Sequence, residues 1–393
     1  MIIQIHDRPE IARPDAREIP FVDGVARYLS GLTDALRDTG HEVVHLALGR
    51  DLARAGSRDE GWLTRPCRGV RRSRALEADI LDLLQDLDPG ALHFHGVDFV
   101  MPPAFLQQIA RRWPTVATLH DVGMFCPKRT RMRRDDSVCG LRRGAVCLAT
   151  RCFRPFQGAS PISELVNMAL ANRRIAAFSD IGRIVCPSRY IADLAQLHGM
   201  PADRMRVVPN FSRFPRRHSE RPGDRQILFV GRMEREKGFE LLIRTLGQLG
   251  DLRWHLTAIG AGPLRDLATE RLGQGRVTLL DPVAPEALDN AYRAADLLVL
   301  PYLMPESFGM VGVEALSQGC PVIGFPVGGA GDWMTPQYGA IPVTPGDVGA
   351  LANAIRDALD APPEPSTADW PFGIAAHASR MAAIYDEARL EHG

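Results

Sequence analysis

Short apolar runs alternate with amphipathic stretches along the whole chain. Runs such as MIIQI at the start and DLLVLP near residue 300 are four to eight residues long, which is typical of buried strands. Between the runs, apolar residues recur every three or four positions, and the clearest series is Val22, Val25, Leu29, Leu32 and Leu36. This spacing predicts amphipathic helices. Strands that alternate with helices indicate parallel sheets with helices on both faces.

The pattern predicts strands and helices in both halves of the chain. In the first half the expected strands are MIIQI, HEVVHLAL, ALHFHG, TVATLH, RIVCP and RVVPN, and the expected helices cover 22–40, 74–87, 102–112, 161–179 and 188–199. In the second half the strands are QILFVG, WHLTAIG, VTLL, DLLVLP, CPVIGF and GAIPV, and the helices lie near 238–249, 263–272, 285–294, 311–319 and 346–360.

A polar, proline-rich stretch at 209–226 separates the two halves and lacks apolar periodicity. We therefore predict an α/β protein with two doubly wound domains that face each other across a cleft. The first domain covers 1–210 and the second covers 211–371. A final helix at 372–393 is expected to pack back on the first domain. Ligands of such sheets lie beyond the carboxyl ends of the strands, so the residues that follow strands are the candidates for function.

The composition is that of an ordinary globular protein, with 393 residues, 45% hydrophobic, 24% charged and a formal net charge of zero. Residues 1–210 carry 30 Lys+Arg against 24 Asp+Glu, whereas residues 211–393 carry 17 against 23. The excess of six positive charges in the first half favours an acidic partner there. No apolar run approaches the ~18 residues of a membrane span, and the strand-like start is unlike a signal peptide. We expect a cytoplasmic protein with reduced cysteines; peripheral contact with the inner membrane face stays open.

Two cations in the second half follow a strand directly. In FVGRMEREKGFELL, Arg232 and Lys237 lie between a strand and a helix. Lys237 is one of only two lysines among 47 basic residues, and Gly238 beside it permits close backbone approach. An arginine, a lysine and a helix N-terminus together suit a diphosphate.

Two glutamates eight positions apart mark the run PESFGMVGVEALSQGCPVIG. Glu306 lies in the loop after a strand, and Glu314 lies inside the next helix. A loop carboxylate can accept hydrogen bonds from sugar hydroxyls, and a carboxylate inside the helix can bridge a ribose diol. Ser307, Phe308 and Gly309 would present backbone N–H groups at the helix start, where an anion is stabilised.

The segments GRMEREKGFELL, AYRAADLLVLP and PESFGMVGVEALSQGCPVIG, in this order and spacing, resemble the nucleotide-sugar domain of retaining GT-B glycosyltransferases of family 4, which consist of two Rossmann-like domains. The resemblance implies that Arg232 and Lys237 hold the donor diphosphate. It also implies that Glu314 binds the ribose, and that Glu306 with the Phe308–Gly309 backbone engages the transferred sugar, with Ser307 among the donor-binding residues.

At two further donor contacts the sequence matches the pattern of the family only in part. Val283 falls where members of the family contact the base, although Asp281-Pro282 replaces the usual glycine before it. Members commonly carry paired glycines before the first helix, and here only Gly24 matches, because Asp23 takes the place of the other.

The resemblance implies that a sugar passes from a nucleotide diphosphate to an acceptor hydroxyl with retention, without a metal cofactor. A UDP-sugar is favoured and a GDP-sugar comes next; the acceptor would be a sugar, a glycoside or a lipid-linked glycan. His120 matches the first-domain histidine that contacts the donor sugar, and His95 is expected to line the cleft. An inverting mechanism would instead use His120 or Asp121 as a general base, and the residues alone leave both open.

The segment from Thr118 to Cys152 holds four of the seven cysteines, and we expect a long loop at 121–160. Cys126, Cys139, Cys147 and Cys152 are separated by 12, 7 and 4 residues, which is looser than the usual paired spacing of zinc ligands. A structural zinc site, ahead of an iron–sulfur cluster, and small buried hydrophobes are both open interpretations. Arg131, Arg133 and Arg134 of this loop could dock an anionic acceptor.

Two other classes of function compete with glycosyl transfer. The segment 128–154 has nine Lys+Arg against two Asp, so a cysteine-bound metal finger could bind nucleic acid or sense redox state. It has few aromatic residues for base stacking, and it leaves the second half unexplained, so we expect no nucleic-acid partner. A phosphorylase or a sugar-nucleotide isomerising enzyme would keep the fold and change the reaction.

Overall fold

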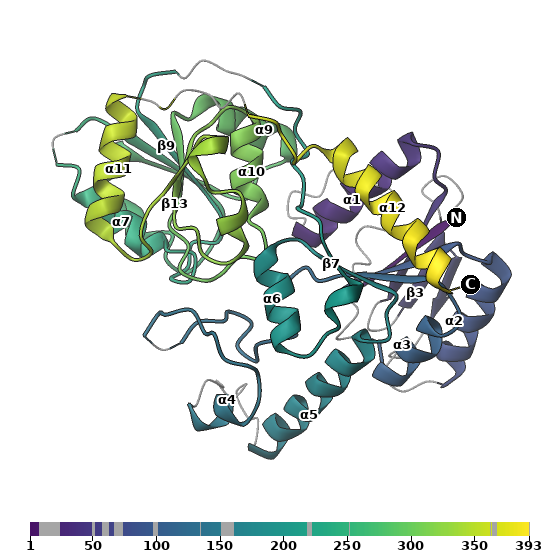
Figure 1. Ribbon diagram of the computed structural model, residues 1–393. Coiled ribbons are helices and arrows are strands. Elements are labelled where there is room, and N and C mark those ends of the chain that lie inside the picture. The colour runs from purple at the N-terminus through teal and green to yellow at the C-terminus, as the bar shows by residue number, and fades with distance from the viewer. Residues whose placement is uncertain are drawn as a thin grey trace.

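The computed structural model describes residues 1–7, 24–48, 52–56, 63–66, 74–96, 101–133, 135–150, 161–217, 222–250, 252–361, 363 and 368–392. The chain forms two α/β lobes, each built around its own sheet, with β1–β8 in the first lobe and β9–β14 in the second (Figure 1). The predicted fold class is confirmed.

The sheet of the first lobe has the order β4-β3-β2-β1-β5-β6-β7-β8. Its parallel strands are β1 (Ile2–His6), β2 (Val43–Leu48), β5 (Ala91–His95), β6 (Thr115–Thr118), β7 (Arg183–Cys186) and β8 (Met205–Val207). Two antiparallel edge strands, β3 (Leu52–Gly56) and β4 (Leu63–Pro66), were not expected. Their sequences LARAG and LTRP carry too few apolar residues to show a strand pattern.

Helices of the first lobe follow the predicted periodicity closely. They are α1 (Gly24–Asp38), α2 (Arg74–Leu87), α3 (Pro103–Ala110), α5 (Pro161–Phe178) and α6 (Arg189–Leu197). The short helix α4 (Ala145–Ala149) was not predicted, because it lies in the segment that was expected to be a loop. In α1 the buried side chains include Leu29, Leu32 and Leu36, which belong to the predicted apolar series. The Ser188 hydroxyl begins α6 by accepting a hydrogen bond from the Ile191 N–H, as is usual for a serine N-cap.

The second lobe contains a six-stranded parallel sheet of order β11-β10-β9-β12-β13-β14. The strands are β9 (Gln226–Val230), β10 (His255–Ile259), β11 (Val277–Leu280), β12 (Leu297–Leu300), β13 (Val322–Gly324) and β14 (Ala340–Pro342). The helices are α7 (Phe239–Gly247), α8 (Leu267–Leu272), α9 (Pro285–Ala294), α10 (Met310–Ser317) and α11 (Val348–Asp360). From β9 the chain adds β10 and β11 on one side, and it then returns to add β12, β13 and β14 on the other side. The strand order therefore reverses between β9 and β12. Ligands of such sheets bind at this point of reversal.

The last helix, α12 (Ile374–His392), runs beside α1 on the first lobe although it follows the second lobe in sequence (Figure 1). Its buried side chains Met381, Ile384 and Tyr385 join the core around Val116 and Val185. Such burial stabilises by about 25 cal/mol per Å² of apolar surface removed from water.

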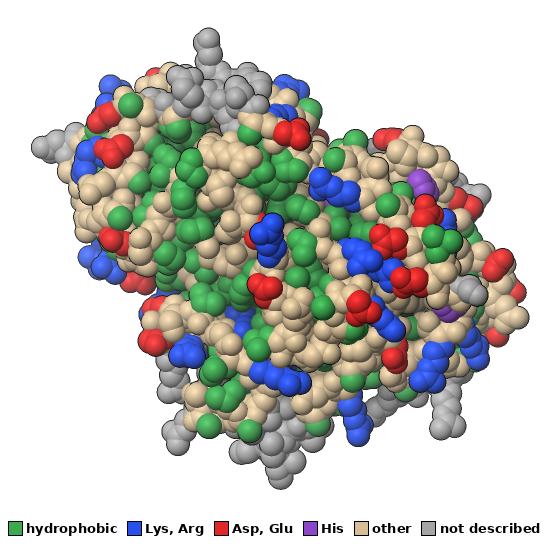
Figure 2. Space-filling view, viewed as in Figure 1, with side chains coloured by type: hydrophobic (Ala, Val, Ile, Leu, Met, Phe, Trp, Pro, Cys, Tyr) green, Lys and Arg blue, Asp and Glu red, His purple; other side chains and the backbone are tan. Residues whose placement is uncertain are grey.

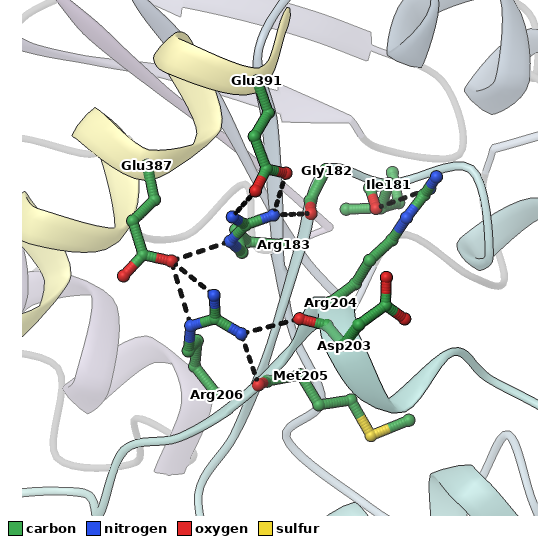
Figure 3. Close-up of polar contacts among 9 residues, drawn as sticks. All are labelled: Ile181, Gly182, Arg183, Asp203, Arg204, Met205, Arg206, Glu387 and Glu391. Carbon is green, nitrogen blue, oxygen red and sulfur yellow. Dashed lines mark hydrogen bonds and ion pairs between the residues drawn. The ribbon is translucent and has the colours of Figure 1, made fainter.

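Ion pairs hold the carboxyl-terminal end of α12 to the start of β7 (Figure 3). Arg183 donates to Glu391 and, at 2.8 Å, to Glu387. Arg206 also pairs with Glu387, at 2.7 Å. The Arg183 side chain is only 5% exposed, so these carboxylates offset the cost of burying its charge. Figure 2 shows positive and negative side chains interleaved over this part of the first lobe.

The carboxyl ends of the two sheets face each other. Ser188, just after β7, donates from its hydroxyl to the Ser307 carbonyl after β12, at 2.7 Å. The Arg189 N–H donates to Asp332 across the same boundary, also at 2.7 Å. Residues that follow strands in both lobes are thereby brought together. Among the described residues, no helix is long and apolar enough to cross a membrane.

Candidate functional site

The loop that carries the two predicted phosphate cations packs tightly against β12. Gly238 precedes α7 with a φ of +69°, in the left-handed region that favours glycine. A Cβ atom there would lie 1.8 Å from the Pro301 carbonyl oxygen. Only glycine therefore fits, and the close approach places Lys237 beside the loop that leaves β12.

Lys237 and Glu306 form an ion pair at this place. Their side chains are 15% and 18% exposed, so water screens the pair only in part. The Lys237 ammonium also lies 4.4 Å from the centre of the Tyr302 ring, a distance at which a cation is attracted to the ring face. Burial, with the Glu306 charge second, raises the pKa of Tyr302. The Tyr302 hydroxyl is therefore neutral, and it donates to the Val230 carbonyl.

Arg232 lies in the same loop, after β9, and its side chain is more than half exposed. Its guanidinium pairs with Glu234 at 2.5 Å. Both predicted cations thus follow one strand, but each already has a carboxylate partner in the protein. On binding, the oxygens of a diphosphate would replace these carboxylates as the partners of the two cations.

The loop before α10 is held by its backbone oxygens. The carbonyls of residues 306–308 accept hydrogen bonds, in order, from the Gly329 N–H at 2.7 Å, the Ser188 hydroxyl at 2.7 Å and the Trp333 indole N–H at 2.5 Å. Gly309 then begins the helix with a φ of +87°. Because three successive carbonyls are bonded, the peptide planes are fixed, and so is the direction of the N–H groups at the helix start.

Glu314 lies in α10 and is only 1% exposed. Its carboxylate accepts from the Arg213 guanidinium at 3.1 Å and from the Tyr292 hydroxyl at 3.2 Å. Burial, and then Glu314, raises the pKa of Tyr292, while Arg27 of α1 lowers it through its charge. The Tyr292 hydroxyl therefore stays neutral and donates to the Glu314 carboxylate. Its predicted contact with a ribose stays a prediction.

The two weaker donor positions lie at the edges of this region. Gly24 is the first residue of α1, and a Cβ atom there would meet nothing within 4 Å. Val283 follows β11 and is partly buried against the core of the second lobe. Asp23 lies outside the described residues.

His120 follows β6 at the edge of the first sheet and is partly exposed. Its Nε2 lies 2.9 Å from Nδ1 of His95, and its ring lies edge-on to Tyr28 at 4.9 Å. The expectation that His95 lines the cleft is wrong: it is 0% exposed and lies beneath His120. Asp121 is committed to its own loop, because its two oxygens accept from the Gly123 N–H at 2.6 Å and from Arg129 at 3.0 Å.

Family models match both lobes. Residues 22–211 match the model described as Glycosyltransferase Family 4, and residues 224–361 match Glycosyl transferases group 1. The chain belongs to glycosyltransferase family 4. Its resemblance to this family in sequence is thereby confirmed.

Curated relatives match over part of their length. The chain is 34% identical over 194 residues to the D-inositol 3-phosphate glycosyltransferase of Nocardia farcinica, a match that covers 42% of each protein. It is 37% identical over 153 residues to the protein of that name from Mycolicibacterium smegmatis, covering 36% of the chain and 34% of the relative. The chain thus spans less than half the length of these relatives.

Solved structures share the GT-B fold across the whole chain. Sucrose-phosphate synthase from Thermosynechococcus elongatus superposes with a TM-score of 0.63 at 19% identity, covering 99% of the chain and 96% of the neighbour. Starch synthase IV from Arabidopsis thaliana, solved with ADP and acarbose, gives 0.64 at 14% identity and covers 99% of both. HepE from Anabaena, solved with UDP, gives 0.56 at 18%, covering 99% and 98%.

The cysteine segment of this family 4 chain does not gather a metal site within the described residues. No group of three or more His, Cys, Asp or Glu side chains there is placed to hold a metal ion. Cys126, Cys139 and Cys147 are free thiols, and Cys152 lies outside the described residues. The zinc site stays a prediction without support from this geometry.

The arginines of the same segment have different environments. Arg131 is 3% exposed and donates to the Leu141 carbonyl at 2.8 Å, so its expected contact with an acceptor is wrong: it stabilises the loop instead. Arg133 is exposed, and Arg134 lies outside the described residues. Asp136 reaches the second lobe and pairs with Arg235 at 2.6 Å, within the loop of the phosphate cations.

Three residues of this region were not predicted from the sequence. Ser188 and Trp333 hold the loop before α10, and Arg213 pairs with Glu314. Ser188 occurs in the run CPSRYIADL, where a serine before a helix indicates an N-cap. No local signal indicates its second bond, because the partner is 119 positions away.

Proposed function

We propose that the protein transfers a sugar from a nucleotide diphosphate sugar to an acceptor hydroxyl, with retention at the anomeric carbon. The observation that carries the proposal is the contact between Lys237 and Glu306. In a sugar nucleotide the anomeric carbon is bonded directly to the diphosphate. Groups for the diphosphate and for the sugar must therefore lie within a few ångströms of each other, as these two do.

The charges suit a leaving diphosphate. Negative charge grows on the diphosphate oxygens as the glycosidic bond breaks, and fixed cations stabilise that charge. Lys237 and Arg232 supply two cations, and the start of α10 supplies backbone N–H groups. The leaving oxygen helps to deprotonate the acceptor on the same face of the sugar, and in this proposal that step needs no metal ion.

The environment of Asp121 supports retention over inversion. An inverting enzyme needs a base that can take the proton of the acceptor. Both oxygens of the Asp121 carboxylate already accept hydrogen bonds within their loop, and the loop would have to open before this carboxylate could act as a base.

For the donor we favour a UDP-sugar, with a GDP-sugar next, and UDP is the nucleotide in the solved HepE complex. For the acceptor we propose a sugar, a glycoside or a lipid-linked glycan that carries a negative charge. Two observations support an anionic acceptor: the curated relatives are named for inositol 3-phosphate, and the first half of the chain has an excess of positive charge.

Thermal unfolding with UDP, GDP and ADP tests the donor site. A nucleotide at 100 times its Kd stabilises the folded state by about 2.7 kcal/mol, so one of the three should raise the Tm. In Lys237→Met the Tm increase should shrink strongly, because the ammonium that pairs with the diphosphate is gone. Lys128→Met is the matched control: it removes the only other lysine, which donates to the Met132 carbonyl.

Turnover is then measured as nucleotide release from the sugar nucleotide that binds. Removal of a group that stabilises developing charge costs on the order of 10²–10³ in kcat, and this loss is expected for Lys237→Met. The proposal is wrong if no nucleotide diphosphate stabilises the protein, or if both lysine variants release nucleotide at the wild-type rate.

A further inference from the structure

Six of the eleven histidines lie close together in the first lobe, between the site and α12. They come from β1, β2, β5, the end of β6 and α12, and they are His6, His45, His93, His95, His120 and His377. Two pairs bond ring to ring: His6 Nε2 lies 3.1 Å from His45 Nδ1, and His95 Nδ1 lies 2.9 Å from His120 Nε2. Five of the six are buried, although histidine is less often fully buried than the apolar residues are.

His95 is the member that links the cluster to the site. It is 0% exposed, and its ring lies 3.8 Å, centre to centre, from that of His93 on the same strand. His93 in turn bonds the Tyr385 hydroxyl of α12 and the Thr118 hydroxyl of β6, each at 2.8 Å. The ring of His95 therefore has a fixed position under His120.

Burial keeps the rings of His93 and His95 neutral. It lowers the pKa of His93 and of His95 well below the ordinary value of 6.5, and the charges of neighbouring histidines, His120 among them, lower it further. A neutral imidazole carries one proton, so one ring nitrogen donates and the other accepts.

The surroundings of His95 decide which nitrogen carries the proton. Its Nε2 is buried and has no hydrogen-bond partner in the part of the chain that the structure describes. A proton on Nε2 would leave a buried N–H without a partner, which is rarer in proteins than a buried acceptor without one. The proton therefore lies on Nδ1, and His95 donates it to Nε2 of His120.

We propose that His95 is a positioning residue that holds His120 in the tautomer with its proton on Nδ1. In that tautomer Nε2 of His120 accepts the hydrogen bond from Nδ1 of His95. Any hydrogen bond that His120 makes from Nδ1 is then one that it donates. Toward a sugar hydroxyl oxygen, His120 acts as a donor and not as a base. This inference rests on the proposed glycosyl transfer for its effect on rate, but the tautomer itself does not depend on that function.

Three substitutions at His95 separate positioning from packing. In His95→Asn the amide nitrogen takes the place of Nδ1, so donation to His120 is retained. In His95→Gln it takes the place of Nε2, and in His95→Phe the ring has no nitrogen, so donation is lost in both. We expect near-wild-type kcat for His95→Asn and a loss of about tenfold for the other two, the equivalent of one hydrogen bond. Nucleotide Kd values should change little.

His45→Gln is the matched control, because it removes a buried imidazole of the same cluster that bonds His6 and Thr33 and not His95 or His120. It should lower the Tm without a selective loss of kcat. The proposal is overturned if all three His95 variants turn over like the wild type. It is also overturned if all three lose kcat alike, because that result indicates packing and not donation.

Nitrogen NMR of the wild-type protein labelled in histidine tests the tautomer without any substrate. His120 is assigned by the signal lost in His120→Asn. We expect a protonated Nδ1 and an unprotonated Nε2 for His120, and the opposite pattern overturns the proposal even if every His95 variant fails to fold. If the wild type transfers no sugar but shows this tautomer, the proposed function has failed and the inference about His95 stands.

Discussion

Gly238→Ala should displace the loop that carries Lys237 and thereby slow sugar transfer. The new Cβ would lie 1.8 Å from the Pro301 oxygen, and real Cβ atoms essentially never approach within 3.0 Å. The two backbones must therefore separate by at least 3.0 − 1.8 = 1.2 Å. A φ of +69° costs a residue with a side chain roughly 1–2 kcal/mol more.

This separation acts directly on the proposed site. Gly238 follows Lys237, and Pro301 leads into the loop of Glu306, so the same movement draws the two partners apart. A misplacement of about 1 Å can cost on the order of 10²-fold in rate. We therefore expect a lower Tm and a loss of that order in nucleotide release from the sugar nucleotide.

Gly247→Ala on the same helix is the control. Gly247 lies at the other end of α7, where an added Cβ would meet nothing within 4 Å. Alanine favours a helix over glycine by roughly 0.5–1 kcal/mol, so the Tm should rise slightly with turnover unchanged. If Gly238→Ala keeps both the wild-type Tm and the wild-type turnover, the close approach does not position Lys237 and the reasoning fails.

Three further predictions concern other parts of the chain. Ser188→Ala should lower stability by about 1 kcal/mol through the lost helix cap and lower kcat by freeing the Ser307 carbonyl; an unchanged kcat would show that the contact between the lobes is not needed. Arg183→Met should destabilise the protein at neutral pH in urea titrations. The hydrogen bonds of Arg183 lower the pKa of Glu387 and Glu391 below the ordinary 4.5, so their contribution is present above that pH and is lost as pH falls through the lowered values; a pH-independent difference would contradict this. Elemental analysis checks the zinc hypothesis, which requires a stoichiometric amount of metal that a chelator removes with loss of stability.

Local sequence pattern predicted most of the helices and strands. The expected bounds of α2 and α9 agree with the structure, because amphipathic periodicity ends where the helix does. The helix expected at 238–249 begins one residue later, because Gly238 has a left-handed φ. The edge strands β3 and β4 were missed because their pairing depends on β2 and not on their own apolar residues.

Candidate residues were predictable where they follow strands. Lys237 and Glu306 are 69 positions apart in sequence, yet both could be named, because the carboxyl ends of parallel strands share one edge of the sheet. Their direct contact could not be predicted, since it depends on how closely Gly238 packs on Pro301. The burial of Arg131 could not be predicted either, because it depends on how the loop folds around this side chain and not on the local pattern of arginines.

The sequence by itself determined that the chain forms two α/β lobes with parallel strands, because helices and strands each impose their own spacing on the apolar residues. It also determined which loops lie at the carboxyl ends of the sheets, because parallel strands all end at the same edge. Only the tertiary structure decided which side chains meet. The bond between Ser188 and Ser307 joins two lobes, and the bond between His95 and His120 joins β5 to the loop after β6. Such contacts depend on distances of a few tenths of an ångström between segments far apart in the chain, and no local pattern encodes those distances.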